Sequence, residues 1–217
     1  MQIHNLSEIN SVLNHFLGQI RNVNVHTDSM RFRRNIERIG EIMAYELSKT
    51  LEYNDIEIKT PLGTKNTTEI ANQVVICSIL RAGLPLHTGF LNYFDAAENG
   101  FISARRHHPN NDDYFDILVE YQAIADFNGK NLILVDPMLA TGQSIVAVFK
   151  NLIETGTAKE IHIAVVIAAP EGIAYLEQHL PDNCHLWIAT LDESLDENSY
   201  IVPGLGDAGD LSYGSKL

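Results

Sequence analysis

The fold is decided by the stretch Leu134-Val-Asp-Pro-Met-Leu-Ala-Thr-Gly-Gln-Ser144. It begins inside the apolar run 131–135, which predicts a buried strand, and it leads into the helical pattern 145–152. A strand that turns directly into a helix places unpaired backbone N–H groups and the positive end of the helix dipole at the carboxyl edge of a sheet. Gly142 allows a ligand to approach the backbone closely, and the neighbouring Thr and Ser hydroxyls add donors. The stretch therefore predicts an anion-binding turn, with an ordinary capped loop as the alternative.

One carboxylate lies in this turn. Asp136 would not help to bind a bare phosphate, but it can accept hydrogen bonds from the hydroxyl groups of a ribose. A phosphorylated sugar would use both parts of the turn. A Walker A phosphate loop is excluded, because Gly142 is not followed by Lys-Ser or Lys-Thr.

Strands and helices alternate around the turn. The strands are expected to be near-continuous in Val, Ile and Leu, which predicts a central, mostly parallel sheet flanked by helices. One strand, 117–121, follows the turn Asn110-Asn-Asp-Asp113 and is expected to be an antiparallel strand of a flap. The predicted strands are 74–80, 101–104, 114–119, 131–135, 161–168 and 185–190, and the predicted helices are 83–94, 142–154 and 171–179.

The N-terminal part has a different pattern. Apolar residues at helical spacing predict one amphipathic helix over 7–20, starting after Ser7, and a second over 29–51. A short alternating strand is expected at 56–58, followed by a turn at 61–63. We interpret 1–217 as a single domain that consists of N-terminal helices (1–54), an α/β core (71–190) and a C-terminal hood (191–217).

Composition limits the partners. The 217 residues include 15 Lys and Arg against 28 Asp and Glu, a net charge of −13, so nucleic acid and anionic membrane surfaces would be repelled. A small polyanion would need a local cluster of donors and a divalent cation. Cys77 and Cys184 lie in apolar runs and are expected to be buried free thiols. Neither a secretory signal nor a membrane-spanning run is visible, which predicts a cytoplasmic protein.

Four segments carry a resemblance to a known family: Ile79-Leu-Arg-Ala-Gly83, Val135-Asp-Pro-Met-Leu-Ala-Thr-Gly-Gln-Ser144, Ala168-Ala-Pro-Glu-Gly172 and Tyr200-Ile-Val-Pro-Gly-Leu-Gly-Asp-Ala-Gly-Asp210. On these segments the chain resembles the uracil phosphoribosyltransferases, which have the type I phosphoribosyltransferase fold with a flap and a C-terminal base-binding hood. A weaker similarity extends over the N-terminal helices, from Met30 to Glu46. The resemblance implies transfer of the phosphoribosyl group of 5-phosphoribosyl 1-pyrophosphate (PRPP) to uracil, giving UMP and pyrophosphate in pyrimidine salvage.

The same resemblance implies the residues that bind PRPP. Arg81 is expected to hold the pyrophosphate, because a guanidinium fork donates two parallel N–H bonds. A flap arginine falls on Arg106, with Arg105 as the alternative; His107 and His108 depart from the family pattern there, and we interpret them as solvated loop residues. The 5′-phosphate and ribose are assigned to Asp136, Pro137, Met138, Leu139, Ala140, Thr141, Gly142, Gln143 and Ser144, with Gln143 where the family usually has Gly.

The C-terminal segment is expected to select the base. Gly204-Leu-Gly-Asp-Ala-Gly209 matches the dinucleotide pattern GxGxxG, but too few residues follow it for a Rossmann unit. By resemblance, the main chain of Ile201, Gly206, Asp207 and Ala208 contacts uracil, and cytosine should be a poor substrate. Asp207 also faces the PRPP ribose or its Mg²⁺, which is carried in with the substrate. The residues expected at the reacting groups are Arg81, Asp136 and Asp207.

Two other functions are weighed against this one. A phosphoribosyltransferase for another base is disfavoured by the segment that starts at Tyr200. A nucleotide-sensing regulator that binds RNA should carry a basic face; it is disfavoured because the chain is acidic and its arginines crowd into 31–38 and 105–106. The amphipathic N-terminal helices offer faces for association, so a homodimer or a higher homo-oligomer is expected.

Overall fold

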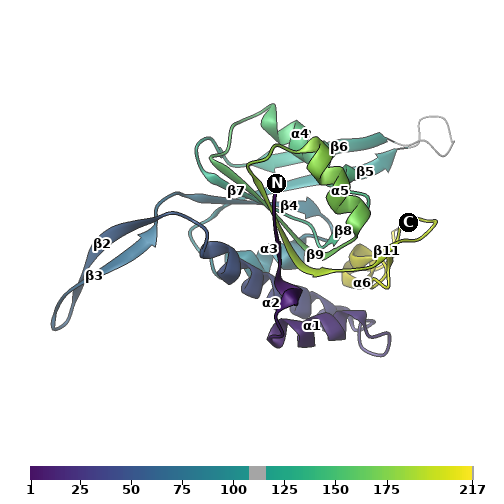
Figure 1. The fold of residues 1–217 in the computed structure, drawn as a ribbon, viewed down its shortest axis with the longest axis horizontal. Helices are drawn as coiled ribbons and strands as arrows, with labels where there is room; N and C mark the ends of the chain where they lie inside the picture. Colours follow the sequence, from purple (N-terminus) through teal and green to yellow (C-terminus); the bar gives the residue numbers. More distant parts are fainter. Residues whose placement is uncertain (108–115, 217) are drawn as a thin grey trace.

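The strand of the deciding stretch, β7 (Asn131–Val135), lies inside a central sheet, between β4 (Val74–Leu80) and β9 (Glu160–Ala168). The computed structural model describes residues 1–107 and 116–216 and places the sheet between two layers of helices (Figure 1). The sheet also contains β1 (Gln2–Asn5), β5 (Glu98–His107), β6 (Asp116–Ile124) and β10 (Cys184–Leu191). The strand order is β1-β10-β9-β7-β4-β5-β6, and an eighth, short strand, β8 (Met138–Leu139), pairs with β9. The prediction of a central, mostly parallel sheet flanked by helices is confirmed.

The flap strand is antiparallel, as expected. β6 (Asp116–Ile124) pairs antiparallel with β5 (Glu98–His107), and the register shifts between Ser103 and Ala104. Every other neighbouring pair of this sheet is parallel. Residues 108–115, which include His108, lie outside the described part of the chain.

The predicted strands leave out one edge of the sheet. β1 (Gln2–Asn5) pairs in parallel with β10 (Cys184–Leu191), and its register places His4 beside Trp187. A four-residue strand of mixed polarity has no recognisable period. Its partner lies about 180 residues away in the chain, so only the tertiary structure supplies the pairing.

The first helix begins later than predicted. A short 3-10 turn (Leu6–Glu8) comes first, and α1 runs from Val12 to Arg21. The correction has a local reason. The Ser11 side chain accepts from Leu13 N–H while the Asn14 side chain accepts from Ser11 N–H, so Ser11, and not Ser7, is the N-cap.

The second helix, α2 (Ser29–Ser48), ends three residues before the predicted boundary. Its expected apolar face is buried, from Phe32 at one end to Leu47 at the other. Together with α1 and α3 (Leu84–Leu91) it packs against one face of the sheet. Helices α4 (Gln143–Ile153) and α5 (Pro170–His179) pack against the other face.

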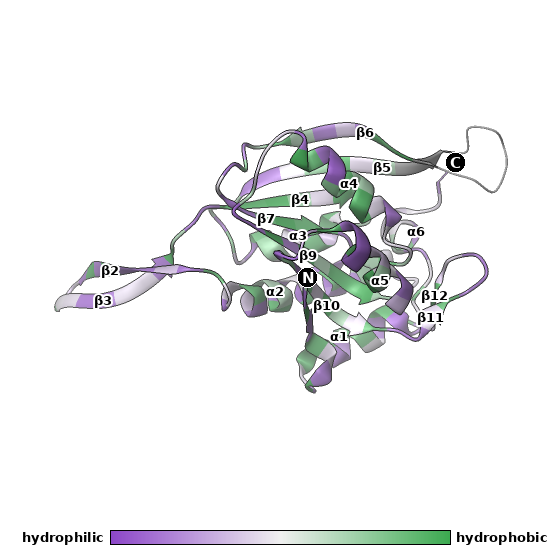
Figure 2. Cartoon of the chain, turned by 45° about the horizontal axis from the view of Figure 1, so that its top comes forward, coloured by the Kyte–Doolittle hydropathy of each residue, from purple (hydrophilic) through white to green (hydrophobic). Residues whose placement is uncertain are grey.

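Alternation along β4 and β7 explains the two cores. Ile76 and Ile133 face α2 and α3, whereas Cys77 and Leu134 face α4. Hydrophobic residues therefore fill these central strands continuously, as Figure 2 shows. Cys184 joins the same core as Cys77, and the prediction of two buried free thiols is confirmed.

A hairpin projects from the body of the molecule (Figure 1). It consists of β2 (Tyr53–Thr60) and β3 (Gly63–Ile70), of which only the first was predicted. Leu62 at its tip is fully exposed. Among the helices of residues 1–107 and 116–216, none combines the length and the apolar character needed to cross a membrane.

Candidate active site

The turn after β7 has the predicted strand-to-helix geometry. Asp136 N–H still pairs with Ala164 O, at 3.1 Å, and α4 begins at Gln143. Gly142 is its N-cap with a φ of 79°, a left-handed conformation that favours glycine. A Cβ at this position would lie 3.0 Å from Gly172 O. Because glycine has no side chain to cap the helix, the N–H groups of the first turn are available to an anion.

The residues between Asp136 and Gly142 alternate between core and surface. Pro137 and Leu139 are buried, and their carbonyls accept hydrogen bonds from the backbone of β9 and of Ala169 at 2.9 to 3.1 Å. Met138 and Ala140 instead border an open pocket. Pro137 and Leu139 therefore hold the shape of the turn, while Met138 and Ala140 face the space in which a ligand would lie.

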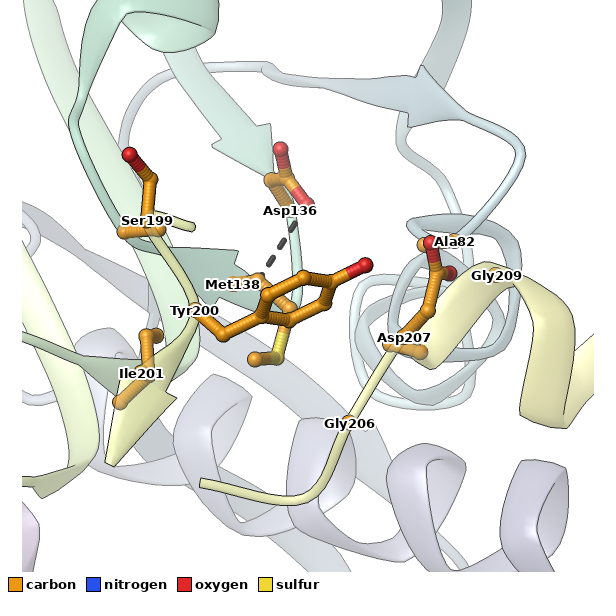
Figure 3. Close-up of a pocket in the computed structure, with 11 residues that line it drawn as sticks. Ala82, Asp136, Met138, Ser199, Tyr200, Ile201, Gly206, Asp207 and Gly209 are labelled. Atoms are coloured by element: carbon orange, nitrogen blue, oxygen red, sulfur yellow. Dashed lines mark hydrogen bonds between the residues drawn. The ribbon is translucent and has the colours of Figure 1, made fainter. Parts of the chain in front are cut away.

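Asp136 has an unusual electrostatic environment. Burial raises the pKa of its carboxyl to about 7, and a hydrogen bond from Met138 N–H, at 3.4 Å, opposes the shift only weakly. The side chain still borders the pocket (Figure 3). A carboxylate that lacks strong protein donors is ready to accept hydrogen bonds from a ligand.

The pocket joins the turn to the C-terminal hood. It is open to solvent and has a cavity volume of about 220 Å³. It brings together three residues of the turn and all four predicted base-contacting residues. The lining residues are Ala82, Asp136, Met138, Ala140, Ser199, Tyr200, Ile201, Gly206, Asp207, Ala208 and Gly209.

The hood is more ordered than a glycine-rich loop. Its start pairs β11 (Ser194–Leu195) with β12 (Ile201–Val202), and its end forms α6 (Ala208–Tyr213). Asp207 is the N-cap of α6, because its Oδ1 accepts from Asp210 N–H at 2.9 Å. This bond fixes the Asp207 carboxylate at the pocket wall (Figure 3).

Arg81 connects the loop after β4 to the hood. It follows β4 directly, and its Nη2 donates to Asp210 Oδ1 at 3.0 Å and to Gly214 O at 3.3 Å. Its buried Nε has no hydrogen-bond partner among the described residues. One part of the guanidinium is thus held by the hood, while its buried Nε is left without a partner among the described residues, and Arg81 itself lies outside the pocket lining.

Other predicted residues lie outside the pocket lining. Thr141, Gln143 and Ser144 lie at the start of α4, where the Thr141 hydroxyl is 3.5 Å from Gln143 N. The buried Gln143 Oε1 has no partner in the described part of the chain. Arg106 pairs with Ile117 through the backbone of β5, and its side chain lies outside the described features. The assignment of the flap arginine therefore stays a prediction.

Four pocket residues were missed from the sequence. Ala82 and Gly209 are small residues next to predicted ones, and Ser199 has a positive φ of 64° that no sequence signal indicates. Tyr200 is 52% exposed, and its ring projects into the pocket in Figure 3. Its position in a segment already assigned to base binding was the one available signal.

Comparisons with known proteins agree with this geometry. A family profile described as uracil phosphoribosyltransferase matches residues 8–215. A uracil phosphoribosyltransferase of Porphyromonas gingivalis is 49% identical over 217 residues, 100% of each chain. The solved structure of a protein from Aquifex aeolicus matches 100% of both chains with a TM-score of 0.87 and 26% identity. A hypoxanthine phosphoribosyltransferase from Staphylococcus aureus shares the fold, with a TM-score of 0.50 and 12% identity over 86% of this chain and 84% of its own.

Proposed function

The chain belongs to the uracil phosphoribosyltransferase family, and we propose that the pocket between the phosphate turn and the hood is where it transfers the phosphoribosyl group of PRPP to uracil. The products are UMP and pyrophosphate. The observation that carries the proposal is a single pocket bordered by Asp136, from the turn, and by Ile201, Gly206 and Asp207, from the hood. This shared pocket supports a proposal in which Asp136 binds the sugar and the hood main chain binds the base at one reacting centre.

PRPP is held at three places. The first-turn N–H groups of α4, with Thr141 and Ser144, bind the 5′-phosphate. Asp136 accepts from the ribose hydroxyls, and their donation favours the ionised carboxylate. Arg81 binds the pyrophosphate with the part of its guanidinium that is not engaged by Asp210 and Gly214. Arg106 is the flap arginine in this proposal.

Uracil is read by the main chain of the hood. Gly206 is exposed at the pocket with a φ of 93°, and Ala208 N–H begins α6. Backbone N–H and C=O groups alternate in a way that matches the alternating edge of uracil. Cytosine would leave such groups unpaired, which costs affinity.

The carboxylates at the pocket fit a magnesium ion that enters with PRPP. In residues 1–107 and 116–216, no group of three or more metal-ligating side chains lies together. In this proposal the ion is held mainly by the diphosphate and water. Asp207 and Asp136, which both border the pocket, would supply hard oxygen ligands to the ion. When bound, the ion would neutralise the diphosphate and make it a better leaving group.

The protein's part in the reaction is to orient and to stabilise charge. The bond from ribose C1 to the pyrophosphate oxygen breaks and a bond from C1 to N1 of uracil forms, while the proton on N1 passes to the departing pyrophosphate or to water. Positive charge develops on the ribose ring during this exchange. Arg81 stabilises the negative charge on the departing pyrophosphate. Asp136 and Asp207, which border the same pocket, hold the ribose in this proposal, and their carboxylates stabilise the positive charge of its ring.

The test is direct. Purified protein receives Mg²⁺, PRPP and one base at a time, and pyrophosphate release is measured with uracil, cytosine and hypoxanthine. We expect release with uracil and little with the other two. Release with hypoxanthine alone would identify a transferase for another base. The absence of release with any base, with tight binding of a nucleotide, would favour a regulator.

We also propose self-association and a cytoplasmic location. Support for association comes from exposed apolar side chains on α1 and on the projecting hairpin, such as Val12 and Leu62. Light scattering at several concentrations measures the mass, and a monomer throughout would refute association. The two free buried thiols fit a reducing compartment.

A further inference from the structure

An ion pair lies directly behind the base-binding loop. Arg21, the last residue of α1, meets Asp192, which follows β10, although 171 residues separate them. The Asp192 side chain is 4% exposed and the Arg21 side chain 24%. Nη1 of Arg21 donates to Asp192 Oδ2 at 2.7 Å, and Nη2 donates to Oδ1. The pair is therefore bidentate and largely buried.

Both charged groups also hold the backbone of Gly204. Arg21 Nη1 donates to Gly204 O at 3.0 Å, and Gly204 N–H donates to Asp192 Oδ2 at 2.8 Å. The N–H and the C=O of one residue are thus bound by the two members of the same ion pair. This arrangement fixes the orientation of the peptide groups on both sides of Gly204.

Gly204 lies where the hood changes direction. Its φ is 59°, and a Cβ would lie 2.1 Å from Ile201 O, so the turn is tight. Ile201 precedes it by three residues and Gly206 follows it by two, and both border the pocket (Figure 3). Any rotation at Gly204 would move the backbone groups on either side of it.

We propose that Arg21 and Asp192 are positioning residues that hold the uracil-binding main chain in its productive conformation. The inference rests on the proposed function, because it assumes that the main chain of 201–208 contacts the base. A site that reads a base through backbone groups has no side chains to adjust, so its precision depends on what fixes the loop. The N-terminal helix thereby contributes to base recognition without touching the base.

The geometry requires arginine. Two Nη atoms reach two carboxylate oxygens while one of them also reaches a carbonyl. A lysine ammonium keeps the charge but cannot reproduce this planar fork. Misplacement of binding groups by about 1 Å can reduce catalytic efficiency by about 100-fold.

The first experiment compares Arg21→Lys with Arg34→Lys, a matched control in which the arginine pairs with Glu37 on the surface of α2. We expect Arg21→Lys to raise the KM for uracil by about 10-fold or more and to change the KM for PRPP by less than about 2-fold. The control should leave both unchanged. Unchanged uracil KM in Arg21→Lys, or an equal rise in both KM values, would overturn the proposal.

A second variant and a second readout guard against a folding defect. Asp192→Asn should give the same selective rise in the KM for uracil. The double variant should raise this KM little further, because both changes break the same contact between the ion pair and Gly204. In the wild type without substrate, the Gly204 amide should exchange its hydrogen far more slowly than the exposed Gly206 amide. Equal exchange rates of the two amides would overturn the proposal that Arg21 and Asp192 hold Gly204. A wild-type protein that does not use uracil as a substrate would instead refute only the proposed function.

Discussion

Replacement of Asp136 by Asn should stabilise the protein at high pH while it lowers activity. Burial raises the pKa of this carboxyl from 3.8 to about 7, so the folded protein holds the proton more tightly than the unfolded chain does. The resulting stability is present below the unfolded value and is lost as the pH rises through about 7. Above that pH the folded protein contains a buried carboxylate that it accommodates at a cost.

The magnitude follows from the two pKa values. The shift from 3.8 to about 7 corresponds to about 4 kcal/mol once the carboxyl is fully ionised. About 2 to 3 kcal/mol of this is expressed between pH 5 and pH 8. Solvent in the pocket screens the charge, so we expect a value at the low end of this range. Asp136→Asn should therefore increase the free energy of unfolding by about 2 kcal/mol more at pH 8 than at pH 5.

Urea unfolding of wild type and variant at both pH values measures this difference. The amide introduced by the substitution contributes equally at both, so the comparison isolates the ionisation. Asp55→Asn, on the exposed hairpin, is the control and should show no such difference. Turnover of Asp136→Asn with PRPP should fall by about 100-fold or more, because the ribose loses its carboxylate acceptor. A stability change that is the same at pH 5 and pH 8 would refute the reasoning.

Three further predictions concern other parts of the molecule. Arg81→Ala should lower turnover by about 100-fold or more and leave the fold intact, whereas Arg31→Ala should not change turnover; steady-state kinetics and circular dichroism decide this. Gly142→Ala should destabilise the protein by about 1 to 3 kcal/mol and weaken PRPP binding, while Gly18→Ala, where a Cβ meets nothing within 4 Å, should stabilise it slightly; urea unfolding measures both. Burial lowers the pKa of His162 to about 3, so the free energy of unfolding falls as the pH drops below 6.5, the ordinary value. Urea unfolding of His162→Asn should show about 2 kcal/mol less loss of stability between pH 7 and pH 5 than the wild type shows.

Much of the candidate site was predictable because its signals are local. The apolar run that ends at Val135, the carboxylate of Asp136 and the left-handed Gly142 lie within eight residues, and each follows from the geometry of a strand-to-helix turn. The bounds of β4 and β7 agree with the predicted ones for the same reason, since continuous burial produces continuous apolar sequence. The predicted start of α1 was wrong because the helical spacing of apolar residues extends to the N-terminal side of Ser11, the residue whose side chain caps the helix.

The sequence by itself determined the family, through four characteristic segments. It also determined the alternation of strands and helices and the strand-to-helix turn after β7, because short-range periodicity and turn chemistry specify these features. Only the tertiary structure decided that β1 completes the sheet edge, that Asp210 contacts Arg81, and that Arg21 and Asp192 hold Gly204. Each of these contacts joins residues that are more than 100 positions apart in the chain, apart from the local bond between Asp192 and Gly204. Such pairings depend on the packing of the whole chain and have no local pattern from which they could be recognised.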